Sequence, residues 1–309
     1  MCFSAIERIL AIGWLDNHGN WKPPKYQQLN KSIDMYNSAF ANNNPYFFTD
    51  KNWDMQKQDG IYRIAVLGDS FIWGDGIVYN KVWSYKLRKK INAKYKNVEL
   101  LSWGKNGWHT GNEFEFMKDI GINYNIDLVV IGFVINDPNY AGNNKAKYLK
   151  WHEKQFFKKL AIVFPNTTSY FLHYIYTFLC STVLNDYGYM NWVDKLYTEG
   201  NLKRYSKLLQ SFSIFCKQNS VELLFVLTPH NCNTSYQKKY SEIIRLLKKE
   251  KIEYLNLFPA VYSKFKNYPI KKLWSNPANG HPGELLTDVY ADEVYKYFKK
   301  NTLNRLEKE

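Results

Sequence analysis

A serine at residue 70 closes an apolar run that begins at Ile64, and a histidine lies far away in the chain, at residue 281. A serine hydroxyl is a weak nucleophile unless a base takes its proton, and imidazole is well suited to that task near neutral pH. Ser70 directly follows Gly68 and Asp69, so the run should end by presenting the hydroxyl at the end of a buried strand. Together, the two residues predict acyl transfer through an activated serine.

Two further segments carry groups that could stabilise the oxyanion formed when a serine attacks a carbonyl carbon. Gly107 lies in a polar stretch after a second apolar run, and the absence of a Cβ would let its N–H approach a substrate oxygen. Asn136 follows a third apolar run, and its side-chain amide could donate to the same oxygen. The chain therefore offers a nucleophile, a base and two oxyanion donors in four separate segments.

The elements around these segments alternate between strands and helices. The pattern predicts strands at 64–67, 98–103, 127–134, 221–227 and 253–257, and helices at 83–95, 112–124, 205–218, 236–251 and 285–298. This alternation predicts an α/β fold in which a parallel sheet of about five strands lies between two helical layers. Because the carboxyl ends of parallel strands share one edge of the sheet, the four segments should meet there.

Apolar spacing within the predicted helices indicates which face of each helix is buried. Trp83, Leu87 and Ile91 recur every four residues, as on one side of a helix. In the last predicted helix, the expected buried face comprises Leu285, Leu286, Val289, Tyr290, Val294 and Phe298. We expect these faces to cover the sheet.

Two regions depart from this alternation. Residues 1–60 predict an N-terminal arm packed on a main domain at 61–309. Residues 3–15 predict a short packing helix, with a truncated membrane anchor as the alternative, and the polar, aromatic residues 16–60, in which Pro23-Pro24 breaks any helix, predict an extended segment. Residues 141–202 predict an aromatic helical insertion between the third and fourth strands. The expected role of its rings is to build a small core; the alternative is a lid, because loops beyond this sheet edge often determine specificity.

The four segments, taken in order, resemble the SGNH (GDSL-type) hydrolase superfamily over roughly residues 60–140 and 203–300. Gly68-Asp69-Ser70 matches its nucleophile block, and Gly107, Asn136 and His281-Pro282 match the other three. The resemblance implies a flavodoxin-like three-layer α/β/α sandwich and a serine esterase without metal or cofactor. It also implies that Ser70 is the nucleophile and His281 the base. The oxyanion hole would comprise the N–H groups of Ser70 and Gly107 and the Asn136 side chain.

One position departs from the pattern of that superfamily, which usually has an aspartate two or three residues before the histidine. Those positions hold Asn279 and Ala278 here. Asn279 could accept a hydrogen bond from the imidazole and orient it, but it supplies no negative charge. Asp69 and Asp137 are candidates for a carboxylate that reaches the ring instead. A catalytically degenerate member of the superfamily is the other interpretation of this substitution.

Four side chains on loops at the same sheet edge could line a substrate pocket: Trp73, Trp108, His109 and His230. Aromatic platforms with nearby lysines suit a sugar, so the predicted substrate is an acetyl or other short acyl ester of a glycan or related alcohol. The alternatives are an O-acyltransferase, in which a polysaccharide hydroxyl resolves the same acyl-enzyme, and a degenerate carbohydrate-binding protein.

Composition limits the partners and the compartment. Forty-two Lys and Arg against 28 Asp and Glu give a formal net charge of +14, but the lysines are spread in short runs, so nucleic acid is not an expected partner. No apolar run reaches the roughly 20 residues of a membrane span, and signal-peptide features are lacking. The location stays open: the lack of signal-peptide features favours the cytoplasm, and association with the cell envelope is the alternative. The cysteines have neither metal-ligand nor disulfide-framework spacing: Cys2, Cys180, Cys216 and Cys232.

Overall fold

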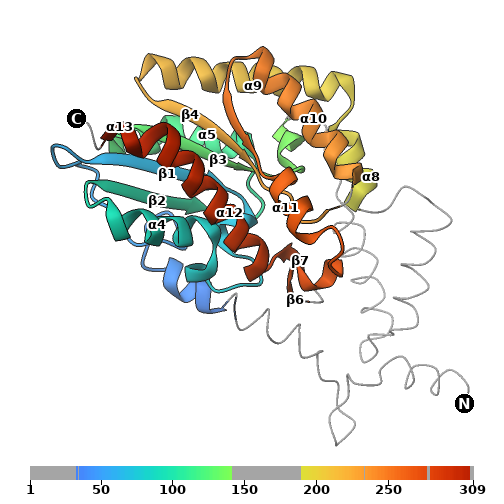
Figure 1. Cartoon of the computed structure of the whole chain (residues 1–309). Helices are drawn as coiled ribbons and strands as arrows, with labels where there is room; N and C mark the ends of the chain where they lie inside the picture. Colours follow the sequence, from blue (N-terminus) through green and yellow to red (C-terminus); the bar gives the residue numbers. More distant parts are fainter. Residues whose placement is uncertain (1–32, 34, 141–188, 233, 277–278, 307–309) are drawn as a thin grey trace, which may run out of the picture.

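The computed structural model describes residues 33, 35–140, 189–232, 234–276 and 279–306 (Figure 1). At its centre is a five-stranded sheet in the order β2-β1-β3-β4-β5, in which all neighbouring strands are parallel. The strands are β1 (Tyr62–Gly68), β2 (Val98–Gly104), β3 (Leu128–Phe133), β4 (Glu222–Leu227) and β5 (Glu253–Asn256). The strand order reverses between β1 and β3, and in open α/β sheets ligands bind at such a reversal, outside the carboxyl ends of the strands.

Helices cover both faces of this sheet (Figure 1). One layer contains α4 (Trp83–Lys94), α11 (Phe258–Phe265) and α12 (Glu284–Phe298). The other contains α5 (Thr110–Asp119), α9 (Glu199–Gln218) and α10 (Thr234–Lys249). The shorter helices are α3 (Ser70–Trp73), α8 (Tyr189–Leu196) and α13 (Asn304–Leu306). The predicted fold class, a parallel sheet between two helical layers, is confirmed.

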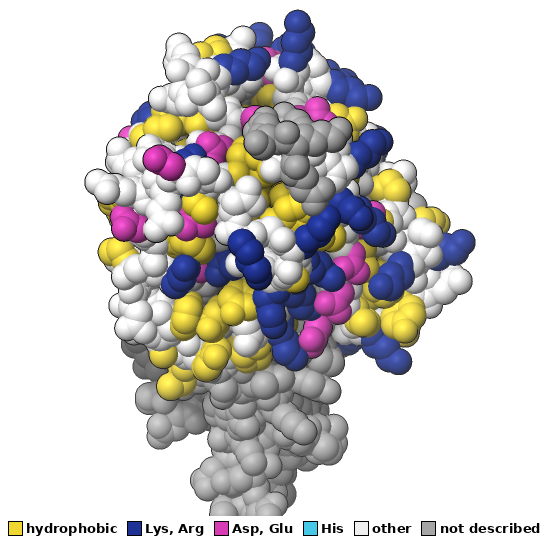
Figure 2. All heavy atoms as spheres, turned by 60° about the vertical axis from the view of Figure 1, so that its left-hand side comes forward, with side chains coloured by type: hydrophobic (Ala, Val, Ile, Leu, Met, Phe, Trp, Pro, Cys, Tyr) yellow, Lys and Arg dark blue, Asp and Glu magenta, His cyan; other side chains and the backbone are white. Residues whose placement is uncertain are grey.

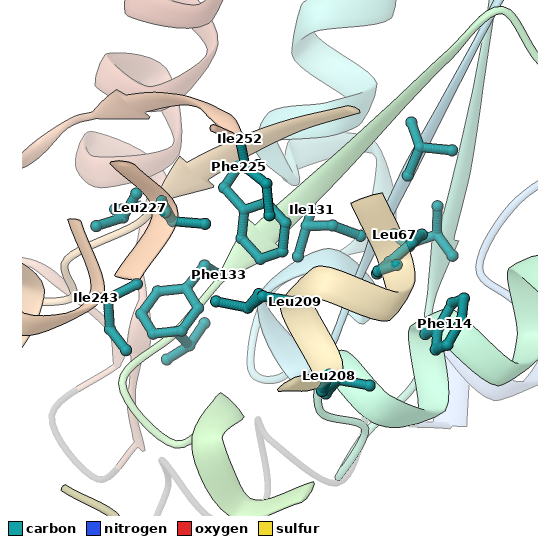
Figure 3. Packing of buried hydrophobic residues seen from close by; sticks show 14 of the residues in the cluster. Leu67, Phe114, Ile131, Phe133, Leu208, Leu209, Phe225, Leu227, Ile243 and Ile252 are labelled. Atoms are coloured by element: carbon teal, nitrogen blue, oxygen red, sulfur yellow. The ribbon is translucent and has the colours of Figure 1, made fainter. Parts of the chain in front are cut away.

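Successive strand residues point to opposite layers, which explains why the strands are apolar throughout. In β1, Ala65 and Leu67 pack toward α5, α9 and α10, whereas Ile64 and Val66 pack toward α4 and α12. Figure 3 shows the first of these layers, where strand side chains such as Phe133 lie among residues of α9 and α10. Burying each such large apolar side chain contributes about 1.5–3 kcal/mol, so the central strands are the most firmly held part of the sheet.

The described part of the N-terminal arm contacts the sheet and the helices, and it is not wholly extended. Residues 35–41 are helical. Further along, the Asp50 carboxylate accepts the Ser102 N–H of β2 at 2.7 Å and forms an ion pair with Arg88 at 2.7 Å. These contacts satisfy backbone polar groups along the β2 edge of the sheet and fasten the arm there.

Several element boundaries differ from the prediction. Helix α9 begins at Glu199 rather than Tyr205, within the segment expected to belong to the insertion. Helix α5 ends at Asp119, and a separate 3₁₀ turn at Gly121–Tyr124 completes the segment predicted as one helix. Residues 141–188, most of the expected insertion, lie outside the described residues.

The predicted face of the last helix contains one error. Leu285 is 40% exposed, whereas Leu286, Tyr290 and Val294 are fully buried. At 100° per residue, Leu285 lies on the opposite side of α12 from Val294. Being apolar and adjacent to Leu286 is therefore not enough to place it against the sheet.

The basic residues do not form one isolated patch on the face shown in Figure 2, where Lys and Arg side chains are mixed with acidic and apolar ones. Some are paired: Lys86 with Asp288 and Lys90 with Asp292 join α4 to α12. Within the described ranges, no helix is long and apolar enough to cross a membrane. Cys216 and Cys232 are free thiols, while Cys2 and Cys180 lie outside those ranges.

Candidate active site

Ser70 is the first residue of α3, immediately after β1. The Asp69 side chain caps this turn by accepting the Phe71 N–H at 2.9 Å. Gly74 ends it in a left-handed conformation, with φ of 91°, and donates its N–H to the Ser70 carbonyl at 3.0 Å. Since few residues other than glycine adopt that conformation without strain, the tight strand–turn–helix is determined locally.

Three glycines, Gly68, Gly104 and Gly132, leave room for α3 on the strands beneath it and are called the glycine seat below. Gly68 of β1 is in register with Gly104 of β2 and with Gly132 of β3. A Cβ at Gly104 would overlap the Trp73 backbone nitrogen, and one at Gly68 would overlap the Ile72 side chain. The serine turn therefore lies directly on strand backbone. The sequence analysis overlooked this seat, although its signal was present as a glycine at the end of two strands and near the end of the third.

His281 reaches the serine from a small antiparallel hairpin, β6 (Trp274–Asn276) and β7 (Asn279–Pro282), which was not predicted. The hairpin is fastened beside α12 by the Gly283 N–H, which donates to the Leu273 carbonyl at 2.7 Å. Nε2 of His281 lies 2.9 Å from Ser70 Oγ. Two residues separated by 211 positions are thus within hydrogen-bond distance at the carboxyl edge of the sheet.

The two expected oxyanion residues follow the neighbouring strands. Asn136 follows β3, and its Nδ2 donates to Asp69 Oδ2 over a long 3.4 Å, which leaves its second amide N–H for another acceptor. Gly107 lies in the loop between β2 and α5, with φ of 80°. A Cβ there would meet nothing within 4 Å, so backbone conformation rather than crowding favours glycine. Their roles as oxyanion donors stay predictions.

This strand order, with serine after β1, asparagine after β3 and histidine between β5 and α12, decides the architecture. The chain has a flavodoxin-like three-layer α/β/α fold. Its own topology supports that statement, because a 2-1-3-4-5 parallel order is flavodoxin-like.

Three solved structures similar to this chain are the following, all of low sequence identity. The acetylxylan esterase Axe2 from Geobacillus stearothermophilus is 12% identical, with a TM-score of 0.47 over 76% of this chain and 93% of that one. TesA is 12% identical, with a TM-score of 0.47 over 77% of this chain and 98% of that one. The psychrotrophic esterase EstA from Pseudoalteromonas sp. is 14% identical, with a TM-score of 0.45 over 77% of this chain and 97% of that one. No family model and no curated protein matches the sequence. Residue roles therefore rest on the geometry of this chain.

The SGNH pattern lacks its usual carboxylate before the histidine here, and the structure places a different one near the ring. Asp75 Oδ2 lies 3.7 Å from His281 Nε2. The sequence analysis did not select Asp75, whose signal is its position between Gly74 and Gly76, just after the serine turn. The Asn279 backbone pairs with Asn276 in the hairpin, and the Asn279 side chain lies outside the described part of the chain.

The two carboxylates suggested from the sequence are engaged elsewhere. Asp69 binds the Phe71 N–H and Asn136, and Asp137 accepts the Val134 N–H at 3.0 Å. Burial raises the pKa of Asp69, while the Phe71 hydrogen bond and the His281 charge act in the opposite direction. Asp69 thus influences His281 electrostatically but is used mainly to hold the serine turn and Asn136.

The aromatic residues expected in a pocket are mostly committed to packing. Trp73 is only 4% exposed and stacks on Phe47 with ring centroids 5.2 Å apart, so the structure places it in the core rather than on an open surface. Trp108 is half-buried against Phe48 and Phe116. His109 directly precedes α5, and burial lowers its pKa. Trp73 is therefore too buried to bind substrate in this structure.

His230 lies close to the candidate dyad. Its ring contacts Phe71 edge-on at 6.0 Å, and Phe71 contacts the His281 ring at 5.7 Å. Nε2 of His230 is 3.2 Å from the Tyr236 hydroxyl. Burial, and then the His281 charge, lowers the pKa of His230 to about 3. A neutral imidazole at this position can contribute polarity and shape to the site without competing as a second base.

A cluster of buried acids lies near the serine turn, and one of its members, Glu113, was not selected in the sequence analysis. Glu113 and Asp137 are fully buried, and neither Glu113 oxygen has a hydrogen-bond partner among the described residues. Burial raises the pKa of both groups well above the ordinary range, and the charge of Asp69 adds to the effect. In the described residues, no group of His, Cys, Asp or Glu side chains is arranged to hold a metal ion.

Proposed function

We propose that the protein is a serine esterase that hydrolyses a carboxylic ester, with an acetyl or other short acyl group on a carbohydrate as the substrate. The observation that carries this proposal is the 2.9 Å separation between Ser70 Oγ and His281 Nε2. At that distance an imidazole can take the serine proton directly. Similarity to esterases at 12–14% identity agrees with the fold but assigns no residue.

In the first half of the reaction, His281 Nε2 accepts the Ser70 proton as Oγ attacks the ester carbonyl carbon. The carbonyl oxygen becomes an oxyanion, for which the expected donors are the N–H groups of Ser70 and Gly107 and the Asn136 amide. Collapse of this intermediate breaks the bond to the alcohol oxygen, and the imidazolium returns the proton to that oxygen. The products of this half are a free alcohol and an acyl-enzyme on Ser70.

In the second half, water takes the place of the alcohol. His281 accepts a proton from water as its oxygen attacks the acyl carbon, and then returns that proton to Ser70 Oγ as the acyl group leaves as a carboxylic acid. The same two side chains serve both halves, and no redox step or external electron source is involved.

The proposal is tested by p-nitrophenyl acetate hydrolysis with wild type, Ser70→Ala and His281→Ala. We expect kcat to fall by about 10³-fold or more in both variants, with the free energy of unfolding little changed. The matched control is Ser211→Ala, because this exposed serine bonds only within its helix, to the Lys207 carbonyl. Wild-type turnover no greater than that of Ser70→Ala, together with no fluorophosphonate labelling of Ser70, would overturn the proposal.

The acyl acceptor is tested separately with an O-acetylated oligosaccharide as substrate. Release of acetate into water, at a rate unaffected by added deacetylated oligosaccharide, supports the hydrolase. Transfer of the acetyl group to the added sugar in preference to water would instead establish the O-acyltransferase, which uses the same acyl-enzyme.

A further inference from the structure

We infer that Asp75 is the carboxylate that supports His281, and that the buried Asn37 of the N-terminal arm holds it in place. The serine turn would then supply both the nucleophile and the negative charge for its base. This inference rests on the proposed esterase function.

The position of Asp75 is the first argument. Its Oδ2 lies 3.7 Å from His281 Nε2, the nitrogen that also faces Ser70 Oγ at 2.9 Å. That separation is an ion-pair distance rather than a hydrogen bond. A carboxylate at this distance attracts the positive charge that develops on the ring when His281 takes the serine proton. Both side chains are partly exposed, so solvent weakens the effect without removing it.

The competing carboxylates have other partners. Asp69 holds the Phe71 N–H and the Asn136 amide, and Asp137 is buried beneath Asn136 with the Val134 N–H. Glu284, three residues beyond the histidine, forms an ion pair with Lys81 at 2.8 Å. Asp75 is thus the described acid for which an ion pair with His281 is observed.

The backbone around Asp75 leaves it little freedom. Its N–H donates to the Ser70 carbonyl at 3.1 Å, and the glycines on both sides have positive φ, 91° at Gly74 and 77° at Gly76. A Cβ at Gly74 would lie 2.7 Å from the Val82 side chain and 3.1 Å from the Ile77 carbonyl. The chain therefore turns sharply on both sides of Asp75 and is closely packed before it.

Asn37 of the N-terminal arm holds this segment through hydrogen bonds. Its side chain is fully buried, and Nδ2 donates to the carbonyls of Gly74 at 3.0 Å and Ile77 at 2.9 Å. Its Oδ1 accepts the Tyr79 N–H at 3.0 Å. Both amide protons and the carbonyl oxygen are thus used on the segment that carries Asp75. A buried amide so fully paired is costly to remove, because its partners would lose their bonds.

These contacts give Asp75 and Asn37 distinct positioning roles. Asp75 would stabilise the imidazolium that forms as Oγ attacks, so its loss should raise the barrier more than it weakens substrate binding. Asn37 would act through Asp75 by fixing the turn. The effects of changing both residues should therefore overlap rather than add.

The first test compares Asp75→Asn with wild type in p-nitrophenyl acetate hydrolysis. We expect kcat to fall roughly 10- to 100-fold, as removal of a nearby opposite charge suggests, with KM within about twofold and the melting temperature unchanged. Asp75→Glu should recover part of kcat. The matched control is Asp119→Asn, because Asp119 is an exposed acid whose contact with Lys118 is long. This variant should leave kcat unchanged.

The second test adds Asn37→Ala and the double variant Asn37→Ala/Asp75→Asn, with folding checked by circular dichroism. We expect Asn37→Ala to lower kcat and the double variant to be little worse than Asp75→Asn. Wild-type kcat in Asp75→Asn, with Ser70→Ala inactive, would refute the role of Asp75 while leaving the esterase intact. Additive losses would refute the role of Asn37. If wild type shows no turnover that depends on Ser70, both this inference and the proposed function are refuted.

Discussion

The two halves of the candidate dyad are supported in very different ways. Ser70 lies on three strands of the central sheet, with its turn seated on Gly68, Gly104 and Gly132 and braced by the arm. His281 lies on a separate two-stranded hairpin, which the Gly283 N–H closes at its base by donating to the Leu273 carbonyl. The nucleophile is thus part of the global fold, whereas the base belongs to an appended element.

The difference predicts how each half responds to damage. Crowding beneath the serine turn must disturb the buried centre of the sheet, so it should cost stability and activity together. Crowding in the hairpin can be relieved by a local shift, so it should cost activity more than stability. Three substitutions test this comparison.

The largest effect is expected for Gly104→Ala. The added Cβ would overlap backbone atoms of Ile72 and Trp73, which cannot move without displacing α3. We expect the free energy of unfolding, measured with urea, to fall by about 3 kcal/mol or more, and esterase activity to be lost.

Gly200→Ala is the control for that substitution. Gly200 lies in the first turn of α9, and a Cβ there meets nothing within 4 Å. The alanine should leave stability unchanged or raise it by about 0.5–1 kcal/mol through helix propensity. Equal stability of the two variants would contradict the glycine seat.

A smaller loss of stability is expected for Gly283→Ala in the hairpin. Its Cβ would overlap the Trp274 carbonyl oxygen, so the hairpin must shift relative to Ser70. We expect kcat to fall at least about tenfold, because base and nucleophile lose their alignment, while stability falls by only about 1 kcal/mol.

Gly280→Ala is the matched control in the same hairpin, since its Cβ would make ordinary contact with the Trp274 ring at 3.7 Å. It should retain most of the activity. A loss of stability in Gly283→Ala as large as that in Gly104→Ala would show that the hairpin is not a separate unit.

The third prediction concerns pH and affects only the serine side of the comparison. Because burial raises the pKa of Glu113, the folded state must keep a proton that the unfolded chain releases above about pH 4.5. The stability contributed by this proton is complete below that pH and is lost as pH rises toward the folded-state pKa. The loss per group is at most about 1.4 kcal/mol per pH unit.

Glu113→Gln should therefore keep more of its low-pH stability at pH 8 than wild type does. Urea unfolding from pH 4.5 to 8 measures the difference, which should widen as pH increases. The control is Glu115→Gln, on the same helix, because the Glu115 side chain is exposed and paired with Lys118. The free energy of unfolding of this variant should depend on pH as that of wild type does. A parallel curve for Glu113→Gln as well would mean that the buried acid does not titrate as its surroundings indicate.

Much of the fold could be predicted from the sequence, because local composition reports burial. A parallel strand covered on both faces is apolar at every position, so all five strands of the sheet were located within a few residues. The hairpin was missed because its strands are short and contain Trp, Ser, Asn, Gly and His, with no alternation to detect. Helix α11 was missed because its apolar positions, Phe258 to Phe265, span only two turns.

The candidate site residues could be selected from the sequence for the same reason, and their roles stay predictions. Ser70, Gly107 and Asn136 could be selected because each follows an apolar run, and parallel strands bring such ends together. Trp73 was misplaced because composition cannot show that the arm covers it with Phe47. The buried Glu113 could not be found either, since it lies among the polar residues of an amphipathic helix.

Local sequence patterns were enough to locate the strands, the serine turn and a candidate base, because hydrophobic period and glycine-limited turns act over a few residues. The packing of the whole chain settles which carboxylate faces His281, that Asn37 binds the serine turn, and that three glycines make room for that turn. Those relations depend on distances between residues far apart in the chain, set by how the layers pack, and they leave no periodic trace in the sequence.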